Sequence, residues 1–233
     1  MKAIFKRELR SYFTTMLGYI FLTMFLVLTG VLFYLNNIYF GVTSVKNFFS
    51  LLTSWAVFII PILTMRLFAE DRKLKTDQLL MTAPVPVRSI VLGKFLAAGC
   101  VLAGALAVTL IYVIVISFFG TVNWAETISC YIGFLLLCGV VLAIGSFMSS
   151  LTDSQIVAAV STYAILIVTV FLGNIAAALP DPFQSLLLWL SPTERFLDFA
   201  MGILDPSALV YYISLIALFV FLTMNVMERR RLS

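Results

Sequence analysis

One group of carboxylates in this sequence has a spacing that could support chemistry. Glu70, Asp71 and Asp77 lie within eight residues of one another. Phosphoryl-transfer and hydrolytic sites need clustered carboxylates, metal ligands or a base beside a nucleophile. Here six basic residues surround the group, from Arg66 to Lys94. A charged, solvated helix is therefore the preferred interpretation of this segment.

Other reactive residues are missing or isolated. The sequence contains no histidine, which excludes Ser-His and Cys-His nucleophilic sites and H-E-x-x-H zinc hydrolysis. Cys100, Cys130 and Cys138 each lie inside an apolar run, so we expect reduced packing residues. The Gly93-Lys94 pair lacks the other residues of a Walker A loop. The sequence therefore predicts no catalytic, cofactor-binding or metal-binding residues in this chain.

The composition shows which elements must position these residues. Of the 233 residues, 62% are hydrophobic and 11% charged, whereas soluble domains have roughly 45–50% and about 25%. So little charge excludes a soluble enzyme and a disordered chain. The sequence predicts an all-α polytopic membrane protein, a single transmembrane domain over residues 1–233, because a spanning helix needs about 20 apolar residues. Its six predicted spans cover approximately 16–35, 50–67, 95–119, 129–151, 156–179 and 208–227.

Basic residues are distributed unevenly among the connections. Thirteen of the fifteen lie before the first span, between the second and third spans, or after the sixth. Only Lys46 and Arg195 fall on the opposite side. Because positively charged segments remain in the cytoplasm, the pattern predicts a plasma-membrane protein with both termini and the loop 68–94 in the cytoplasm. The basic excess thus indicates topology, and we expect no nucleic-acid partner.

Two cytoplasmic segments outside the spans have amphipathic patterns. Residues 1–15 place apolar side chains on one helical face and basic side chains elsewhere, which is typical of a helix lying in the membrane interface. In the loop 68–94, a charged stretch leads to Leu79, Leu80 and Met81. An apolar tip on a charged stalk suits docking onto another protein. The alternative, in which these three residues fold back against the bilayer, remains open.

The outer connection, between the fifth and sixth spans, has a different pattern. Ser191 and Glu194 form a capping box with Pro192 at the first helical position. Phe196 and Phe199 belong to the apolar face that follows. Together with the short apolar run before it, this pattern predicts a hairpin that partly re-enters the outer leaflet. A pair of ordinary surface helices is the alternative.

In this order, the segments resemble the permease subunits of type-2 ABC transporters, most closely the branch associated with gliding motility and copper-enzyme maturation. The resemblance covers nearly the whole chain. Its most specific stretches are residues 5–13, the loop from Arg66 to Lys94, and residues 191–205. The loop departs from the family pattern at two positions, with Lys75 where glycine is usual and Gln78 where glutamate is usual.

The resemblance implies a role for each segment. Residues 1–15 would form a cytoplasmic elbow helix that includes Lys6, Arg7, Glu8 and Arg10. The loop would carry a coupling helix seated on an ATPase, through Glu70, Asp71, Lys75, Thr76, Asp77, Gln78, Leu79, Leu80 and Met81. The outer re-entrant region, 180–206, would include Ser191, Pro192, Glu194, Phe196 and Phe199.

The resemblance also implies a subunit that works only in a complex. ATP and Mg²⁺ would be bound by separate ATPase subunits, in agreement with the missing Walker A loop. Two permeases, either two copies or two paralogues, would assemble with two ATPases in the lipid bilayer. The substrate would pass between the second and fifth helices of the permeases, and the expected direction is export.

Two other functions remain as alternatives. A membrane assembly subunit without transport activity would have the same composition. An ion-coupled secondary transporter usually keeps ionisable residues at bilayer depth, and none lies deep inside the six predicted spans. The sequence therefore favours the permease, then the assembly subunit, then the secondary transporter.

Overall fold

The computed structural model describes residues 1–75, 85–177, 180, 184, 188–189 and 191–232. All regular secondary structure within these ranges is helical. In chain order the helices are α1 (Lys2–Thr14), α2 (Met16–Phe33), the π-helix η1 (Tyr34–Tyr39), α3 (Lys46–Thr64), α4 (Ala69–Lys73), α6 (Val87–Val108), α7 (Leu110–Phe119), α8 (Trp124–Leu151), α9 (Gln155–Ala177), α11 (Pro192–Ala200) and α12 (Pro206–Leu232).

Several of these helices are long and apolar enough to cross a bilayer. In the described part of the chain they form five segments: Met16–Tyr39, Lys46–Lys73, Val87–Phe119, Trp124–Leu151 and Pro206–Arg231. The prediction of an all-helical, multi-pass membrane protein is thus confirmed. The further span expected at 156–179 overlaps α9, whose apolar stretch of described residues is shorter, and that span stays a prediction.

The third membrane segment begins earlier than residue 95, the start that the sequence predicts for this span. Helix α6 begins at Val87, directly after Pro86. The sequence favoured a later start because Arg88 and Lys94 are charged, but Lys94 is buried beside carboxylates and the helix continues through it. At Thr109 the segment changes from α6 to α7.

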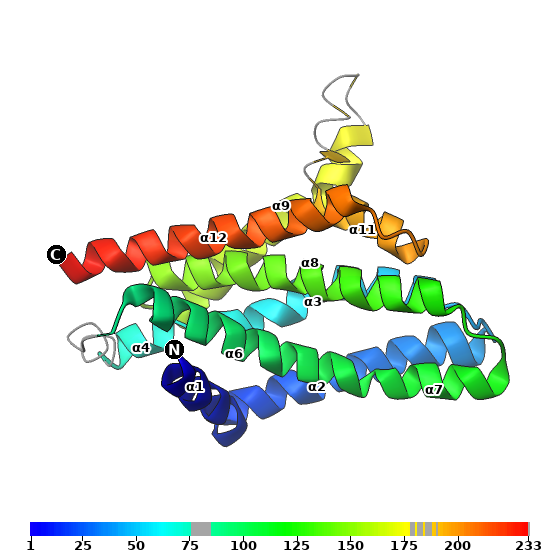
Figure 1. The fold of residues 1–233 in the computed structure, drawn as a ribbon, viewed down its shortest axis with the longest axis horizontal. Coiled ribbons are helices and arrows are strands. Elements are labelled where there is room, and N and C mark those ends of the chain that lie inside the picture. Colours follow the sequence, from blue (N-terminus) through cyan, green and yellow to red (C-terminus); the bar gives the residue numbers. More distant parts are fainter. Residues whose placement is uncertain (76–84, 178–179, 181–183, 185–187, 190, 233) are drawn as a thin grey trace.

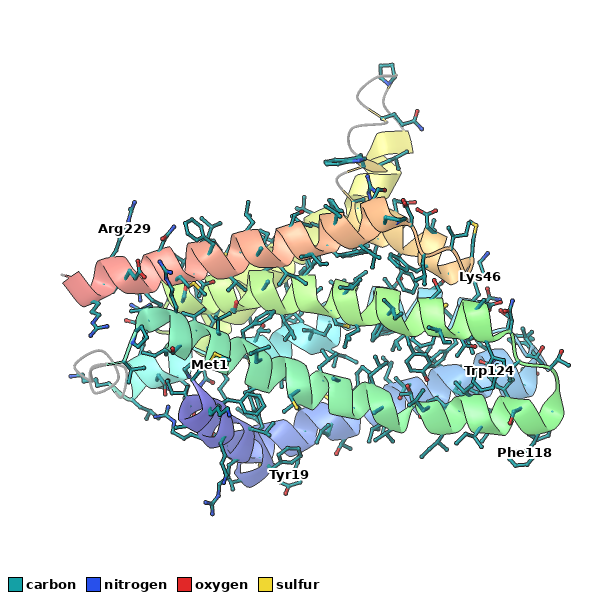
Figure 2. All side chains as sticks on the ribbon, in the orientation of Figure 1. Met1, Tyr19, Lys46, Phe118, Trp124 and Arg229 are labelled. Carbon is teal, nitrogen blue, oxygen red and sulfur yellow. The ribbon has the colours of Figure 1, made fainter. Side chains whose placement is uncertain are left out.

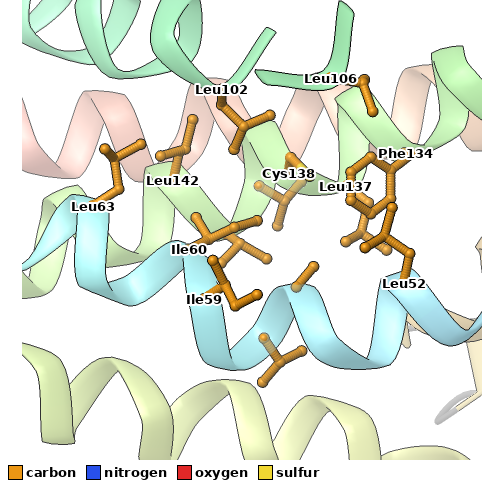
Figure 3. Packing of buried hydrophobic residues seen from close by; sticks show 14 of the residues in the cluster. Leu52, Ile59, Ile60, Leu63, Leu102, Leu106, Phe134, Leu137, Cys138 and Leu142 are labelled. Atoms are coloured by element: carbon orange, nitrogen blue, oxygen red, sulfur yellow. The ribbon is translucent and has the colours of Figure 1, made fainter. Parts of the chain in front are cut away.

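Helix α8 lies at the centre of the bundle, where it packs against α3, α9, α11 and α12. Figure 3 shows side chains of α3, α6 and α8 converging, among them Leu52, Leu102 and Phe134. All three are nearly or completely buried. Because lipid is as apolar as these side chains, close packing rather than exclusion of water must hold the helices together here.

Two glycines of α8 make this close packing possible. A Cβ atom added to Gly145 would lie 2.2 Å from Thr64 Oγ1 of α3, and one added to Gly133 would lie 2.6 Å from Phe199 Cβ of α11. Neither distance is compatible with a side chain. Small residues at such crossings let helix backbones approach in membranes, so these two glycines place α3 and α11 against α8.

The two ends of the bundle carry different elements. In Figure 1 both chain termini lie at the same end as α4, and α11 lies toward the other end. Figure 2 places Met1 and Arg229 at the first end and Lys46, Phe118 and Trp124 at the second. The elements expected on the cytoplasmic side therefore share one end of the molecule.

Candidate functional site

Helix α1 is brought against α6 at a glycine. A Cβ atom added to Gly93 would lie 3.1 Å from Ile4 Cγ2, which is tighter than an ordinary contact. The glycine thus lets α1 pack closely on the first turns of α6. The next residue of α6 is Lys94, whose side chain is buried where α1, α4 and α6 meet.

Lys94 is the centre of a cluster of charges. Its Nζ atom lies 2.7 Å from Asp71 Oδ2 of α4 and 3.3 Å from Glu8 Oε1 of α1. It also donates a hydrogen bond to the Leu67 carbonyl, at 2.7 Å. The Lys94 side chain is only 3% exposed, against 13% for Glu8 and 19% for Asp71. A buried ammonium with two carboxylates and a carbonyl has its charge and its donors satisfied.

Arg7 joins this cluster from the solvent side. Its Nη2 atom lies 2.9 Å from Glu8 Oε1 and 3.9 Å from Asp71 Oδ2. Since Arg7 is about half exposed, its pairs are weaker than those of Lys94. The carboxylates of Glu8 and Asp71 are therefore shared between a buried cation and an exposed one.

A second arginine ties the end of α3 to α1. Arg66 forms an ion pair with Glu70 of α4. Its guanidinium also donates to the Thr15 hydroxyl at 2.5 Å and to the Ser11 hydroxyl at 3.3 Å. We call the six charged residues that join α1, α4 and α6 at this end the stalk network: Arg7, Glu8, Arg66, Glu70, Asp71 and Lys94.

The stalk network surrounds an open cleft of about 270 Å³. Tyr12 of α1 lies at its wall and donates a hydrogen bond to the Leu63 carbonyl, at 3.4 Å. Burial, together with the negative charge of Glu8, raises the pKa of Tyr12 well above its usual range. The hydroxyl therefore remains a neutral donor, and it fastens α1 to the last turn of α3.

The far side of α4 is tied to α8 and to the turn that follows α8. The backbone N–H groups of Phe68 and Ala69 both donate to the Ser149 hydroxyl, at 3.1 Å. Arg72 forms an ion pair with Asp153, between α8 and α9. A single short helix thus contacts α1, α6, α8 and the start of α9.

The charges of the stalk network compensate one another. Every charge of the stalk network has a partner of opposite charge. Among the described residues, no group of three or more histidine, cysteine, aspartate or glutamate side chains could hold a metal ion. Helix α4 is thus fastened to α1 and α6 on one side and to α8 on the other.

One family model covers nearly the whole chain. Residues 2–227 match the model described as ABC-2 family transporter protein. The chain belongs to the ABC-2 family. It is therefore a membrane-spanning permease subunit of an ABC transporter, a class of subunit that works with ATPase partners. No curated protein matches the sequence.

The ABC-2 assignment bears on the residues expected in the coupling loop. Glu70 and Asp71 lie on α4, inside the stalk network, and Lys75 follows α4. The other residues of the predicted coupling site, Thr76, Asp77, Gln78, Leu79, Leu80 and Met81, lie outside the described residues. Their contact with the ATPase stays a prediction.

The departure from the family pattern at Lys75 has a structural counterpart. Lys75 has a φ angle of 56°, in the left-handed region that glycine adopts without steric cost. The glycine that is usual in the permeases this chain resembles thus falls at a position whose backbone conformation favours glycine.

Replacing Lys75 with glycine is expected to stabilise the permease by about 1 kcal/mol, because the Cβ atom is disfavoured in this conformation. The measurement is the thermal unfolding midpoint in detergent, with Lys73→Gly as the matched control inside α4. That control should destabilise by about 1 kcal/mol, since glycine weakens a helix. A lower unfolding midpoint for K75G than for the wild type would show that the left-handed backbone conformation does not strain Lys75.

The predicted helix at residues 1–15 is present as α1. Lys6, Arg7 and Arg10 are exposed on it, as expected for a basic face. Glu8 instead faces Lys94. This inward carboxylate shows that α1 packs against α6 of the permease itself, and the assignment of α1 as an elbow helix stays a prediction.

The predicted outer helix is present as α11. The Ser191 hydroxyl accepts a hydrogen bond from the Glu194 N–H at 3.4 Å, and Pro192 occupies the first helical turn. Phe196 and Phe199 are buried. Most residues of the short apolar run before α11 lie outside the described part, so the re-entrant hairpin stays a prediction.

Sequence reasoning missed three residues that hold the site together, Lys94, Arg66 and Ser149. From the sequence, Arg66 indicates only topology, and Lys94 indicates topology and an incomplete Walker A pair. A signal was present at Lys94, which lies in an apolar stretch between Gly93 and Phe95. A charged residue in such a stretch needs a partner. Nothing in the local sequence distinguishes Ser149 from other serines of α8.

Proposed function

We propose that this permease exports its substrate as one of two permeases bound to two ATPase subunits, and that the loop 68–94 couples ATP hydrolysis to movement of the helices. ATP and Mg²⁺ are bound by the ATPases in this proposal. The observation that carries it is the attachment of α4. This helix forms the first part of the loop and is tied to α1, α6 and α8.

The proposed orientation follows from charge. Both termini and α4 lie at one end of the bundle (Figure 1). Thirteen of the fifteen basic residues belong to the two terminal segments and to the connection from Arg66 to Lys94. Lys46 belongs to the other end. By the positive-inside rule the basic end faces the cytoplasm of a plasma membrane. Closure of an ATPase dimer would then act on the loop next to α4.

The proposed coupling path has three steps. The apolar tip formed by Leu79, Leu80 and Met81 enters a groove on the ATPase, and polar residues of the loop surround it. Movement of the ATPase displaces the loop and with it α4. The stalk network passes this displacement to α1 and α6, while Ser149 passes it to α8. No titratable group within the membrane is needed.

The second permease would pack on the α3–α9 edge. Trp55 and Phe58 of α3 are about half exposed, with ring centroids 6.1 Å apart. Tyr163 of α9 continues this aromatic row and donates a hydrogen bond to the Phe58 carbonyl, at 2.7 Å. Aromatic residues are enriched at protein interfaces. These helices correspond to the second and fifth spans, between which the substrate is expected to pass.

The family branch is also part of the proposal. The stretches 5–13 and 191–205 and the loop from Arg66 to Lys94 resemble permeases associated with gliding motility and copper-enzyme maturation. The stretch 5–13 lies within α1, and α4 and α11 fall within the other two stretches.

The proposal is tested by replacing Leu79 and Leu80 together with aspartate. Two carboxylates in an apolar contact cannot be desolvated without a large cost, so the ATPase should no longer co-purify in mild detergent. ATP turnover of the complex should also lose its stimulation by the permease. The matched control is Leu79→Met with Leu80→Met, which keeps the contact apolar and should retain both properties.

One result would remove the loop from the coupling path. If the double aspartate variant is expressed normally, retains the ATPase and keeps stimulated ATP turnover, the contact lies elsewhere. A membrane assembly subunit whose partner is not an ATPase would show no co-purifying ATPase, even in the wild type. Mass spectrometry of the proteins that co-purify with the wild type distinguishes these two cases.

A further inference from the structure

An apolar groove lies between α6, α8 and α12, away from the stalk network. These three helices run side by side in Figure 1 and contact one another. The groove has a volume of about 500 Å³. Its lining consists of apolar side chains and glycines, among them Phe5, Leu96, Gly99, Leu135, Gly139 and Ile216.

The groove exists because Gly99 leaves space. A Cβ atom added to Gly99 would meet no other atom within 4 Å. Leu96 and Leu135 beside it are each 44% exposed, so the hollow opens to the outside of the bundle. At this depth the surroundings are hydrocarbon, and an unfilled hollow would lose the dispersion contacts of its lining.

One end of the groove points toward basic residues. Arg88 lies on the same face of α6 as Gly99, eleven residues earlier, which places it about 16 Å along the helix. That length matches one leaflet of a hydrocarbon core about 30 Å thick. From α12, Arg231 donates a hydrogen bond at 3.0 Å to the carbonyl of Val85, three residues before Arg88. Arg88 and Arg231 are therefore two cationic side chains near headgroup depth.

We propose that this groove binds an acyl chain of an anionic phospholipid whose phosphate lies near Arg88 and Arg231. Cationic side chains at the membrane surface attract anionic lipids, and the lining accepts hydrocarbon. A helix of another protein is the other occupant that the variants below distinguish from a lipid. The proposal does not depend on the direction of transport.

The test compares two glycines of the same helix. Gly99 and Gly104 both have no atom within 4 Å of an added Cβ, but only Gly99 lines the groove. The full-length wild type, G99F and G104F are each recovered from nanodiscs whose bilayer contains phosphatidylglycerol and phosphatidylcholine in equal amounts. Native mass spectrometry counts the phospholipids that each protein retains. G99F should lose one retained phospholipid, whereas G104F should keep it.

A second pair of variants tests the headgroup. Arg88→Gln should lower the preference for phosphatidylglycerol over phosphatidylcholine about fivefold, the effect of one basic residue near an anionic lipid. Arg10→Gln removes the same charge from an exposed position of α1, turned away from Phe5, and should leave the preference unchanged. Equal thermal unfolding midpoints confirm that all variants are folded.

Two outcomes would overturn the proposal. If G99F and G104F retain the same number of phospholipids, the groove holds no tightly bound lipid. If G99F changes the number of permease copies in the complex and leaves the lipid count intact, the groove is an interface between proteins. An unchanged lipid preference in R88Q would contradict the assignment of the anionic headgroup.

Discussion

Replacing Lys94 with methionine is expected to lower the free energy of unfolding by about 3–5 kcal/mol, the cost of removing one partner from a buried ion pair. Methionine preserves much of the length and apolar stem of lysine but not the charge. Glu8 and Asp71 would then face each other without the cation that lies 3.3 and 2.7 Å from them. The measurement is unfolding in detergent micelles, together with the yield of folded protein.

Two further variants separate charge from packing at Lys94. Lys73→Met removes a lysine that is exposed on α4 and should change stability by less than about 0.5 kcal/mol. Combining K94M with Glu8→Gln and Asp71→Asn removes the two carboxylates that have lost the buried cation and should restore part of the lost stability. If K94M alone unfolds like the wild type, the stalk network does not stabilise the permease.

Replacing Gly145 with alanine is expected to destabilise the permease by about 1–3 kcal/mol, because the added methyl overpacks the α3–α8 crossing. The new Cβ atom would lie 2.2 Å from Thr64 Oγ1 and 2.7 Å from Thr64 Cβ. Thr64 is fully buried at the end of α3, two residues before Arg66, so it cannot move aside alone. The unfolding midpoint should fall, and a shift of α3 should also weaken permease-stimulated ATP turnover.

The matched control for this crossing is Gly139→Ala on the same helix. There the added Cβ atom would meet Ile216 Cδ1 at 2.8 Å, the tip of a flexible side chain that can rotate away. Its effect should be below about 0.5 kcal/mol. Adding Thr64→Gly to G145A removes the opposing atoms and should recover stability. Equal midpoints for G145A and G139A would show that α3 and α8 do not cross as closely as described.

Local features of the fold followed from the sequence. The capping pattern at Ser191 and Glu194 needs only residues three apart, and α11 begins there. The apolar stretches long enough to span a bilayer are likewise visible in the sequence, because length and composition alone define them. These features depend on neighbours along the chain.

The stalk network could not be predicted in the same way. Lys94 pairs with Glu8 and Asp71, which lie on two other helices, and no spacing rule connects such positions. The apolar side chains of α1 show the same limit: Tyr12 is buried, but its neighbour Phe13 is 48% exposed. A hydrophobic pattern identifies side chains that avoid water, and it does not distinguish contact with protein from contact with lipid.

The ion pair between Glu8 and Lys94 also has a consequence for biosynthesis. Lys94 is translated 86 residues after Glu8, an interval of about 4–17 s at about 5–20 residues per second. During this time α1 has left the ribosome without the cation that holds it against α6. The N-terminal helix can therefore dock only after the insertion machinery has received the Val87–Phe119 segment. Its final placement is a late event in the maturation of the chain, although it precedes the other described helices in the sequence.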